Sequence, residues 1–264
     1  MFSYSINKLL NKSSIKFLFD IFERDQKEIK LVGGCVRDAI LSRETKDLDI
    51  AARCEPNEII AVLNKHEIEF EDYAYQYGSI IVYIEDEKIQ ITSLREDINQ
   101  VGRHTNIIYT NNWKKDSLRR DFTMNALYLS AEGDIEDYYN GQQDIEEKRI
   151  SFIGNIEESL QEDYLRIYRY FRFLGLFDEL NILNEYEKIL NEHTLHSFNY
   201  LSNEIIRQEI LKMFNMPYPL NCFYQSHQTQ LKFKWIEIVK EHFIKTNYEL
   251  GLNKCLNKID NIIN

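Results

Sequence analysis

Two glycines and an arginine follow a short apolar run near the N-terminus, in Leu31-Val-Gly-Gly-Cys-Val-Arg-Asp38. Gly33 and Gly34 have no side chain, so a ligand can approach the backbone closely at this point. A helix that begins here would offer free N–H groups to an anion, and Arg37 would add a positive charge. The segment predicts either a phosphate-binding loop or a tight strand–helix turn that carries an exposed arginine.

Two aspartates follow shortly after, in Lys46-Asp-Leu-Asp-Ile50. Residues two apart in a strand point to the same face, so Asp47 and Asp49 would present two carboxylates to one point. Mg²⁺ prefers oxygen ligands and often completes its shell with substrate phosphates. The pair predicts a magnesium site beside the phosphate loop; an ordinary exposed strand end is the simpler alternative.

A third polar segment runs from Asp116 to Ala126 and contains two neighbouring arginines. In a binding site, Arg120 could hold a triphosphate, Asp121 a ribose hydroxyl and Asn125 a nearby backbone group. The alternative is a surface ion pair between the arginines and Asp121, which contributes little to stability.

The most informative segment is Gln161–Arg172, because apolar residues recur around it at helical spacing and predict a buried stripe. The stripe consists of Leu160, Tyr164, Ile167, Tyr168, Phe171 and Leu174. Arg166 and Arg169 are predicted on the opposite side of this helix, with Asp163 and Arg172 on its flanks.

Asp163 and Arg166 lie three residues apart, which makes them neighbours on a helix surface. An ordinary salt bridge is one interpretation of the pair. The other is base recognition, because an acceptor beside a donor fork matches the exocyclic amine and ring nitrogen that cytosine and adenine share. Guanine and uracil present a carbonyl oxygen and a ring N–H in those places. On this interpretation the site selects C and A without a template strand.

Short β-type runs alternate with turns from Ile29 to Tyr139, whereas the pattern is helical from Asn155 onward. Strands are predicted over 29–32, 48–51, 79–84, 88–93, 126–129 and 135–138, and helices over 3–25, 36–42, 56–65 and 116–126. The polar segment 95–115 is predicted as a loop, with or without a short strand over 106–110. The order indicates an α+β fold, with a mixed head over 1–145, an all-helical neck over 146–215 and a short helical tail over 216–264.

Composition limits the classes of protein to which the chain can belong. Its 264 residues, 44% of them hydrophobic, allow about two domains with a sizeable core. Lys and Arg number 32 against 43 Asp and Glu, a net charge of −11. This balance argues against charge-driven coating of nucleic acid or anionic membrane, but it does not exclude a local basic site.

The cysteines and the N-terminus indicate a reduced, cytoplasmic protein that does not bind a membrane. No two of the four cysteines have C-x-x-C spacing; they are Cys35, Cys54, Cys222 and Cys255. The first apolar stretch is interrupted at Asn7 and Lys8 and is therefore too short for a signal sequence. No run of the sequence approaches the ~20 apolar residues that span a bilayer.

Taken in order and spacing, the four segments resemble the class II tRNA nucleotidyltransferases, or CCA-adding enzymes, together with the bacterial poly(A) polymerases. The resemblance extends from Ile29 to Phe177, with a fainter trace over 201–207 and 209–212. The segments that carry it are LVGGCVRD (31–38), KDLDIA (46–51), RRDFTMNAL (119–127), DYYNGQQDIEEKRI (137–150) and EDYLRIYRYFRF (162–173).

The resemblance implies a role for each candidate residue. It implies that Asp47 and Asp49 are the catalytic Mg²⁺ ligands and that Asp163 and Arg166 read the base. It also implies further nucleotide-binding positions, which are Gly33, Gly34, Arg37, Arg120, Asp121, Asn125, Arg169 and Arg172. The implied reaction is attack of a tRNA 3′-hydroxyl on the α-phosphorus of CTP or ATP, with Mg²⁺ stabilising the attacking oxygen and the leaving pyrophosphate.

Three features depart from the family pattern. Members of the family are longer and hold tRNA with further helical domains, whereas 50 residues follow Phe214 here; either tRNA recognition is minimal or a second chain supplies it. Gln90 stands where relatives often have a carboxylate, which leaves the general base unassigned. Ile205 stands where an arginine is common, so the support of the arginine cluster differs.

The expected function is therefore template-independent addition of C and A, from CTP and ATP, to the 3′ end of tRNA. Partial enzymes that add only CC or only A, and poly(A) polymerases, share the same motifs. A truncated relative that binds tRNA without chemistry is the rival from another class. Transfer of a nucleotide to a small molecule is a weaker alternative.

Overall fold

The computed structural model describes residues 2–45, 47–101, 104–223, 235, 237 and 238. These residues divide into two compact units. The N-terminal unit comprises the described residues among 1–100, 104–147 and 151–153, and the other described residues form the C-terminal unit. Most of the predicted tail, including Cys255, lies outside the described residues.

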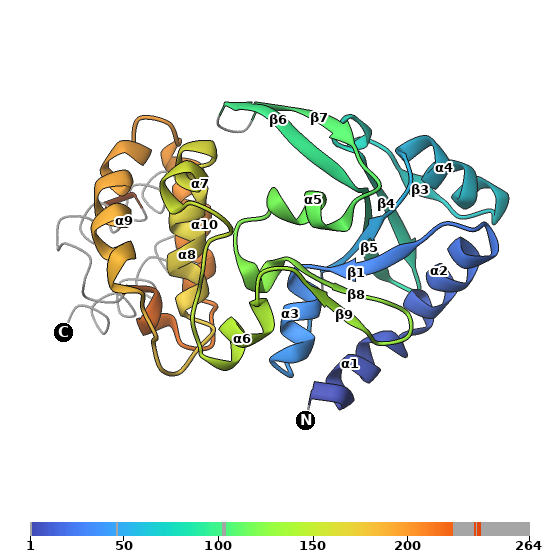
Figure 1. The fold of residues 1–264 in the computed structure, drawn as a ribbon, viewed down its shortest axis with the longest axis horizontal. Helices are drawn as coiled ribbons and strands as arrows, with labels where there is room; N and C mark the ends of the chain where they lie inside the picture. Colours follow the sequence, from blue (N-terminus) through green and yellow to red (C-terminus); the bar gives the residue numbers. More distant parts are fainter. Residues whose placement is uncertain (1, 46, 102–103, 224–234, 236, 239–264) are drawn as a thin grey trace, which may run out of the picture. The chain divides into compact units, whose positions relative to one another are not determined.

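A seven-stranded mixed sheet forms the centre of the N-terminal unit (Figure 1). Its order is β3-β4-β5-β2-β1-β8-β9; β2 and β5 run parallel, and the other neighbouring strands run antiparallel. The strands are β1 (Ile29–Val32), β2 (Leu48–Ala52), β3 (Phe70–Glu71), β4 (Ser79–Ile84), β5 (Glu87–Ser93), β8 (Leu127–Leu129) and β9 (Ile135–Asp137). All six predicted strands are present within one or two residues of their expected ends, so these predictions are confirmed.

The two faces of the sheet have different partners, because successive residues of a strand point to opposite sides. Helix α3 packs against β1, β2 and β8, and α4 packs against β4 and β5. On the opposite face, Val32, Ala51 and Tyr128 form a buried cluster with Trp113 of α5 and with Leu94. The helices of this unit are α1 (Phe2–Leu10), α2 (Ser13–Arg24), α3 (Gly34–Ile40), α4 (Pro56–Lys65), α5 (Trp113–Leu118) and α6 (Gly141–Glu146), with 3₁₀ turns η1 (Tyr75–Tyr77) and η2 (Thr123–Asn125).

Two predicted helices are wrong in part. The helix expected over 3–25 is two helices, because Lys12 has an extended ψ of 132° that ends the helical path between them. The helix expected over 116–126 stops at Leu118. Beyond it, Phe122 is extended and pairs with Phe152 in an isolated β-bridge, a contact that local sequence does not reveal.

The segment predicted as a loop over 95–115 forms a two-stranded sheet and the start of a helix. Strands β6 (Arg95–Val101) and β7 (His104–Tyr109) pair with each other, and α5 follows. The strand alternative over 106–110 is therefore the better one, although the first strand of the pair was not predicted.

The C-terminal unit is helical, as predicted, and α8 lies at its centre. Helix α8 packs against α7, α9, α10 and η3, and its residues Ile167 and Phe171 are fully buried. The elements are α7 (Ile156–Glu162), α8 (Leu165–Leu174), α9 (Asn184–Ser197), α10 (Asn203–Met213) and η3 (Pro219–Phe223). Within the described residues of both units, no helix has the length and apolar character needed to cross a bilayer.

Candidate functional site

The glycine pair connects β1 to α3 in a conformation that favours glycine. Gly33 has a φ of +75°, where an L side chain is strained, and its amide donates to the Leu127 carbonyl oxygen at 3.1 Å. A Cβ atom at Gly33 would lie 3.3 Å from Nη1 of Arg120, and one at Gly34 would lie 3.7 Å from Nη2 of Arg37. Two guanidinium groups therefore border the glycine loop, an arrangement that suits a phosphate.

Three of the predicted nucleotide-binding residues form a continuous chain of hydrogen bonds. Arg37 Nη1 donates to Asn125 Oδ1 at 2.7 Å, and Asn125 Nδ2 donates to Asp121 Oδ1 at 3.0 Å. Arg37 Nη2 also donates to Asp38 at 2.7 Å. Arg37, Asp121 and Asn125 are all buried. Their mutual hydrogen bonds fix the orientation of these groups, so the structure brings the first and third polar segments together.

Asp47 and Asp49 lie at the start of β2, in the same electrostatic neighbourhood as Arg120. Asp47 is exposed immediately before the strand, and Asp49 is half-buried inside it. Burial raises the pKa of Asp49; the charge of Arg120 opposes this shift, and the charge of Asp47 adds to it. A cation between the two carboxylates would offset both the burial and their mutual repulsion, so the donor set fits a hard divalent metal.

The chain itself would supply only part of a magnesium shell. Within the part of the chain that the structure describes, no group of three or more His, Cys, Asp or Glu side chains is arranged to hold a metal. Water and substrate phosphates would have to complete the shell around Asp47 and Asp49, as is common for Mg²⁺. Gln90 pairs with Asp49 in the β2–β5 register, and its amide donates to the hydroxyls of Ser79 and Thr92, each at 3.4 Å.

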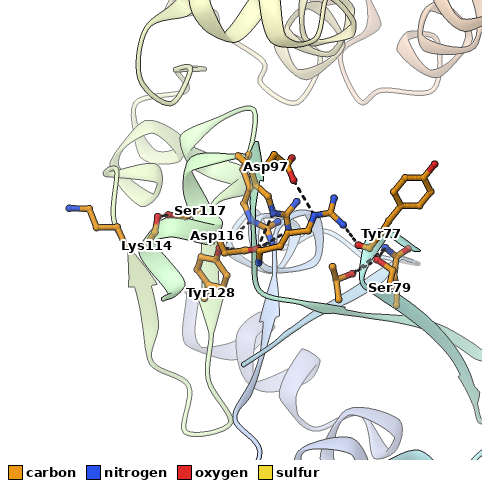
Figure 2. A network of polar contacts seen from close by, with 12 residues as sticks. Tyr77, Ser79, Asp97, Lys114, Asp116, Ser117 and Tyr128 are labelled. Carbon is orange, nitrogen blue, oxygen red and sulfur yellow. Dashed lines mark hydrogen bonds and ion pairs between the residues drawn. The ribbon is translucent and has the colours of Figure 1, made fainter. Parts of the chain in front are cut away.

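A buried carboxylate that sequence reasoning did not assign lies beside Arg120. Asp116 Oδ2 accepts hydrogen bonds from Arg120 Nη2 at 3.2 Å and from the Tyr128 hydroxyl at 2.7 Å. Figure 2 shows Asp116 and Tyr128 in the middle of a polar network that extends to Asp97 and Tyr77. The signal for Asp116 was present in the sequence, because Arg119 and Arg120 follow it at the i+3 and i+4 positions of a helical turn.

The C-terminal unit contains the remaining predicted residues, and it changes the interpretation of Asp163 and Arg166. The expected continuous helix breaks at Asp163, which has an extended backbone (φ −150°, ψ 102°) between α7 and α8. Its carboxylate accepts the Leu165 amide at 2.9 Å, a local side-chain–backbone bond in the turn that precedes α8. The two residues are therefore not neighbours on one helical surface.

Arg166 is buried rather than projecting away from the core. Its Nη1 donates to Ser159 Oγ at 2.7 Å and to Glu162 at 2.9 Å, so residues of α7 cover it. On the same helix, Arg172 forms an ion pair with the buried Glu209 at 2.9 Å. The guanidiniums of Arg169 and Arg172 lie 5.7 and 4.5 Å from the centre of the Phe173 ring.

The family model that matches this chain covers mainly the N-terminal unit. Residues 29–151 match the family model described as the Poly A polymerase head domain. The human mitochondrial CCA tRNA nucleotidyltransferase 1 is 35% identical over 162 residues, which are 61% of this chain and 37% of that protein. The CCA-adding enzyme of Streptococcus uberis is 35% identical over 192 residues, 72% of this chain and 46% of that protein. The chain thus spans less than half the length of these two relatives.

Solved structures show the same fold. The CCA-adding enzyme of Bacillus stearothermophilus in complex with CTP aligns with a TM-score of 0.68 and 24% identity, covering 77% of this chain and 48% of that one. The Thermotoga maritima CCA-adding enzyme complexed with tRNA aligns with a TM-score of 0.66 and 23% identity, covering 88% of this chain and 55% of that one. The predicted α+β class is therefore confirmed.

Proposed function

We propose that the chain is a template-independent nucleotidyltransferase, because residues 29–151 match the Poly A polymerase head domain and the relatives named above are CCA-adding enzymes. Its proposed reaction adds C and A nucleotides, from CTP and ATP, to the 3′ end of tRNA. One observation carries the proposal: the paired carboxylates Asp47 and Asp49 lie in the electrostatic neighbourhood of Arg120, which itself borders the glycine loop.

The N-terminal unit would position the triphosphate for in-line displacement. Gly33 and Gly34 leave room for the phosphates, and Arg120 and Arg37 balance their negative charge. The 3′-hydroxyl loses its proton to solvent water as its oxygen forms a bond to the α-phosphorus, while the bond from that phosphorus to the bridging oxygen breaks and releases pyrophosphate. Mg²⁺ bound at Asp47 and Asp49 would supply charge neutralisation at the phosphates and favour ionisation of the attacking hydroxyl. Gln90 has no proton-accepting role in this scheme, because an amide does not titrate.

The C-terminal unit would choose the base. We assign Asp163 as the acceptor for the exocyclic amine of C or A and Arg166 as the donor to the ring nitrogen, with Arg169 and Arg172 as further nucleotide contacts. Support comes from the chemistry of the pair and from the way Ser159 and Glu162 hold the Arg166 guanidinium. A fixed donor fork discriminates better between bases than a mobile one.

Two further assignments belong to this proposal. The tRNA contacts beyond the 3′ end would come from a region outside the described residues or from a second chain, as the extra length of the relatives suggests. A reducing compartment such as the cytoplasm is supported by three free, buried cysteines, Cys35, Cys54 and Cys222. A non-catalytic tRNA-binding relative is the second candidate, because Gln90, which pairs with Asp49 in the β2–β5 register, cannot accept a proton.

The decisive experiment extends tRNAs that end at the discriminator base, after C, or after CC, with Mg²⁺ and each nucleotide supplied separately. We expect CTP and then ATP to be incorporated and GTP and UTP to be rejected. Asp49→Ala should lower extension by at least about a hundredfold, because a metal ligand is lost. The matched control is Asp20→Ala, which removes an exposed carboxylate that, among the described residues, forms an ion pair only with Arg24, at i,i+4.

Each outcome has a distinct meaning. Full activity of the Asp49→Ala protein would contradict the metal assignment. Incorporation limited to C, to A, or to repeated A would identify a partial enzyme or a poly(A) polymerase. Binding of CTP and tRNA by the wild-type protein without any extension would identify the non-catalytic relative.

A further inference from the structure

We propose that Asp116 is a positioning residue that fixes Arg120 against the glycine loop, so that the loop and the guanidinium form a ready-made triphosphate site. The inference rests on the proposed nucleotide-binding role of the N-terminal unit. It assigns a function to a residue that would not itself touch the substrate.

Asp116 is almost completely enclosed, and both of its oxygens are already occupied. Its side chain is 1% exposed. Oδ1 accepts the Arg95 amide at 3.1 Å and Arg119 Nε at 3.0 Å, while Oδ2 accepts Arg120 Nη2 and the Tyr128 hydroxyl. No lone pair is left for a nucleotide or a metal, so any role of Asp116 in binding acts through its partners.

Asp116 and Tyr128 hold Arg120 so that one edge of its guanidinium group faces the glycine loop. Nη2 is held by Asp116, Nε donates to the Tyr128 hydroxyl at 3.3 Å, and the guanidinium lies 5.2 Å from the centre of the Tyr128 ring. The remaining nitrogen, Nη1, is the atom that a Cβ at Gly33 would approach to 3.3 Å, and it has no partner among the described residues. Two nitrogens thus fix the geometry, and the third is available to an anion.

The charges of the cluster favour an anionic ligand. Three arginines, Arg95, Arg119 and Arg120, are accompanied by Asp116 and by Asp97, which pairs with Arg95 at 3.3 Å. The cluster therefore carries one positive charge more than it has carboxylates. Burial by itself raises the pKa of Asp116, but the charges of Arg119 and Arg120 outweigh it and lower the pKa to about 2. Asp116 consequently stays ionised and holds the guanidiniums together against their mutual repulsion.

The test is a double-mutant cycle read out as CTP affinity, measured by calorimetry on the full chain without tRNA. Asp116→Asn and Arg120→Ala should each weaken CTP binding by about tenfold or more, since charge-assisted contacts to phosphate are lost. If Asp116 acts through Arg120, adding Asp116→Asn to the Arg120→Ala protein should weaken binding by less than about twofold further. Additive losses would overturn the inference.

A matched control and a second variant keep the test independent of folding. Asp25 pairs with Lys65 and His66 in the same unit, so Asp25→Asn should leave CTP affinity unchanged. Tyr128→Phe removes only the hydroxyl that bonds both Asp116 and Arg120, and the same cycle can be run with it if Asp116→Asn does not fold. Inorganic tripolyphosphate should compete with CTP in the wild-type protein and more weakly in Asp116→Asn.

Failure of the two proposals can be told apart. A wild-type protein that binds CTP with the expected cycle but does not extend tRNA contradicts the proposed transferase activity and supports the positioning role. A wild-type protein that binds neither CTP nor tripolyphosphate contradicts both.

Discussion

Arg37, Asn125 and Asp121 illustrate how single residues of this site are held before a substrate arrives. Arg37 donates a hydrogen bond to Asn125 at 2.7 Å, and Asn125 donates one to Asp121 at 3.0 Å. All three residues are buried. Sequence reasoning could place each of them in a motif, because an arginine, an asparagine and an aspartate in these segments suit nucleotide binding. It could not show that they bond one another, because Arg37 and Asn125 are 88 residues apart and nothing in either segment encodes the meeting.

Asp116 gives a prediction for stability in acid. Burial raises the pKa of this carboxyl, but its arginine partners outweigh burial and lower the pKa from 3.8 to about 2. The folded state thus binds the proton less readily than the unfolded chain. The stabilisation is therefore complete above about pH 4 and is lost as the pH falls to about 2; the shift corresponds to about 2 kcal/mol.

Urea unfolding of the wild-type protein and of Asp116→Asn at several pH values tests this. The difference in the free energy of unfolding between the two should narrow by about 2 kcal/mol between pH 5 and pH 2. Asp25→Asn provides a contrast at a carboxyl whose pKa is also lowered, in this case by hydrogen bonding to Lys65, but which does not contact Arg120. A difference that stays constant over the whole range would show that Asp116 titrates normally.

The strands and helices of the N-terminal unit could be predicted where the local sequence pattern determines the secondary structure. Strands β4 and β5 carry apolar side chains on both sides of a two-residue turn at Glu85 and Asp86, which adopt the positive φ values typical of tight hairpins. The local pattern gave the wrong secondary structure where other backbone or side-chain contacts determine it. Phe122 leaves the helical path to pair with Phe152. Asp163 breaks the expected helix, and its side chain accepts the Leu165 amide; aspartate favours such local backbone bonds over helix interiors.

The break at Asp163 separates its structural role from its proposed base-reading role. The side-chain oxygen of Asn can accept the Leu165 amide as that of Asp does, whereas Ala has no acceptor. Asp163→Asn should therefore keep the free energy of unfolding within about 0.5 kcal/mol of wild type, while UTP and GTP become better substrates relative to CTP and ATP. Asp163→Ala should lose about 1 kcal/mol of stability as well, because this hydrogen bond is lost.

Urea unfolding and single-nucleotide incorporation measure the two effects on the same proteins. Asn155, which caps α7 by accepting the Glu158 amide at 3.1 Å, offers the control. Asn155→Ala should lose stability by a similar amount without changing which nucleotides are incorporated. Unchanged discrimination in Asp163→Asn would remove Asp163 from base recognition.

Helix α6 approaches the backbone of η2 very closely at Gly141, and η2 carries Asn125, which bonds Arg37 and Asp121. A Cβ atom there would lie 2.3 Å from the Thr123 carbonyl oxygen and 2.7 Å from its carbon, and both are backbone atoms that cannot rotate away. Thr123 begins η2, the turn that contains Asn125. Gly141→Ala should therefore cost about 1–3 kcal/mol of stability and weaken CTP binding by shifting Asn125.

Gly154 supplies the comparison for that substitution. A Cβ there would meet no atom of the described residues within 4 Å, but the φ of Gly154 is +73°. Gly154→Ala should cost about 1 kcal/mol through backbone strain alone and leave CTP affinity unchanged. Thermal unfolding measures the stability of the two variants, and calorimetry measures their affinity for CTP. Equal CTP affinity in wild type, Gly141→Ala and Gly154→Ala would show that the packing of α6 does not influence the site.

The net charge of the whole chain argues against non-specific RNA binding, but it does not argue against a local cluster of arginines. A net charge of −11 opposes non-specific binding of RNA. The arginines of the N-terminal site, however, gather around one buried carboxylate and the glycine loop. Composition alone could exclude a basic coating but could not reveal this local concentration, because the two differ in arrangement and not in number.

This arrangement predicts a shallow dependence of tRNA binding on salt. A protein that makes 6–10 phosphate contacts loses about 10³–10⁵ in affinity between 50 and 200 mM salt. An acidic chain whose positive charge is concentrated on a nucleotide site neutralises few phosphates of the tRNA, so we expect a loss below about tenfold over the same range. Filter binding of labelled tRNA at four salt concentrations gives the slope, and excess poly(U) should not compete at 150 mM salt. A steep slope together with competition by poly(U) would instead require an extended basic surface, which the balance of 32 basic against 43 acidic residues argues against.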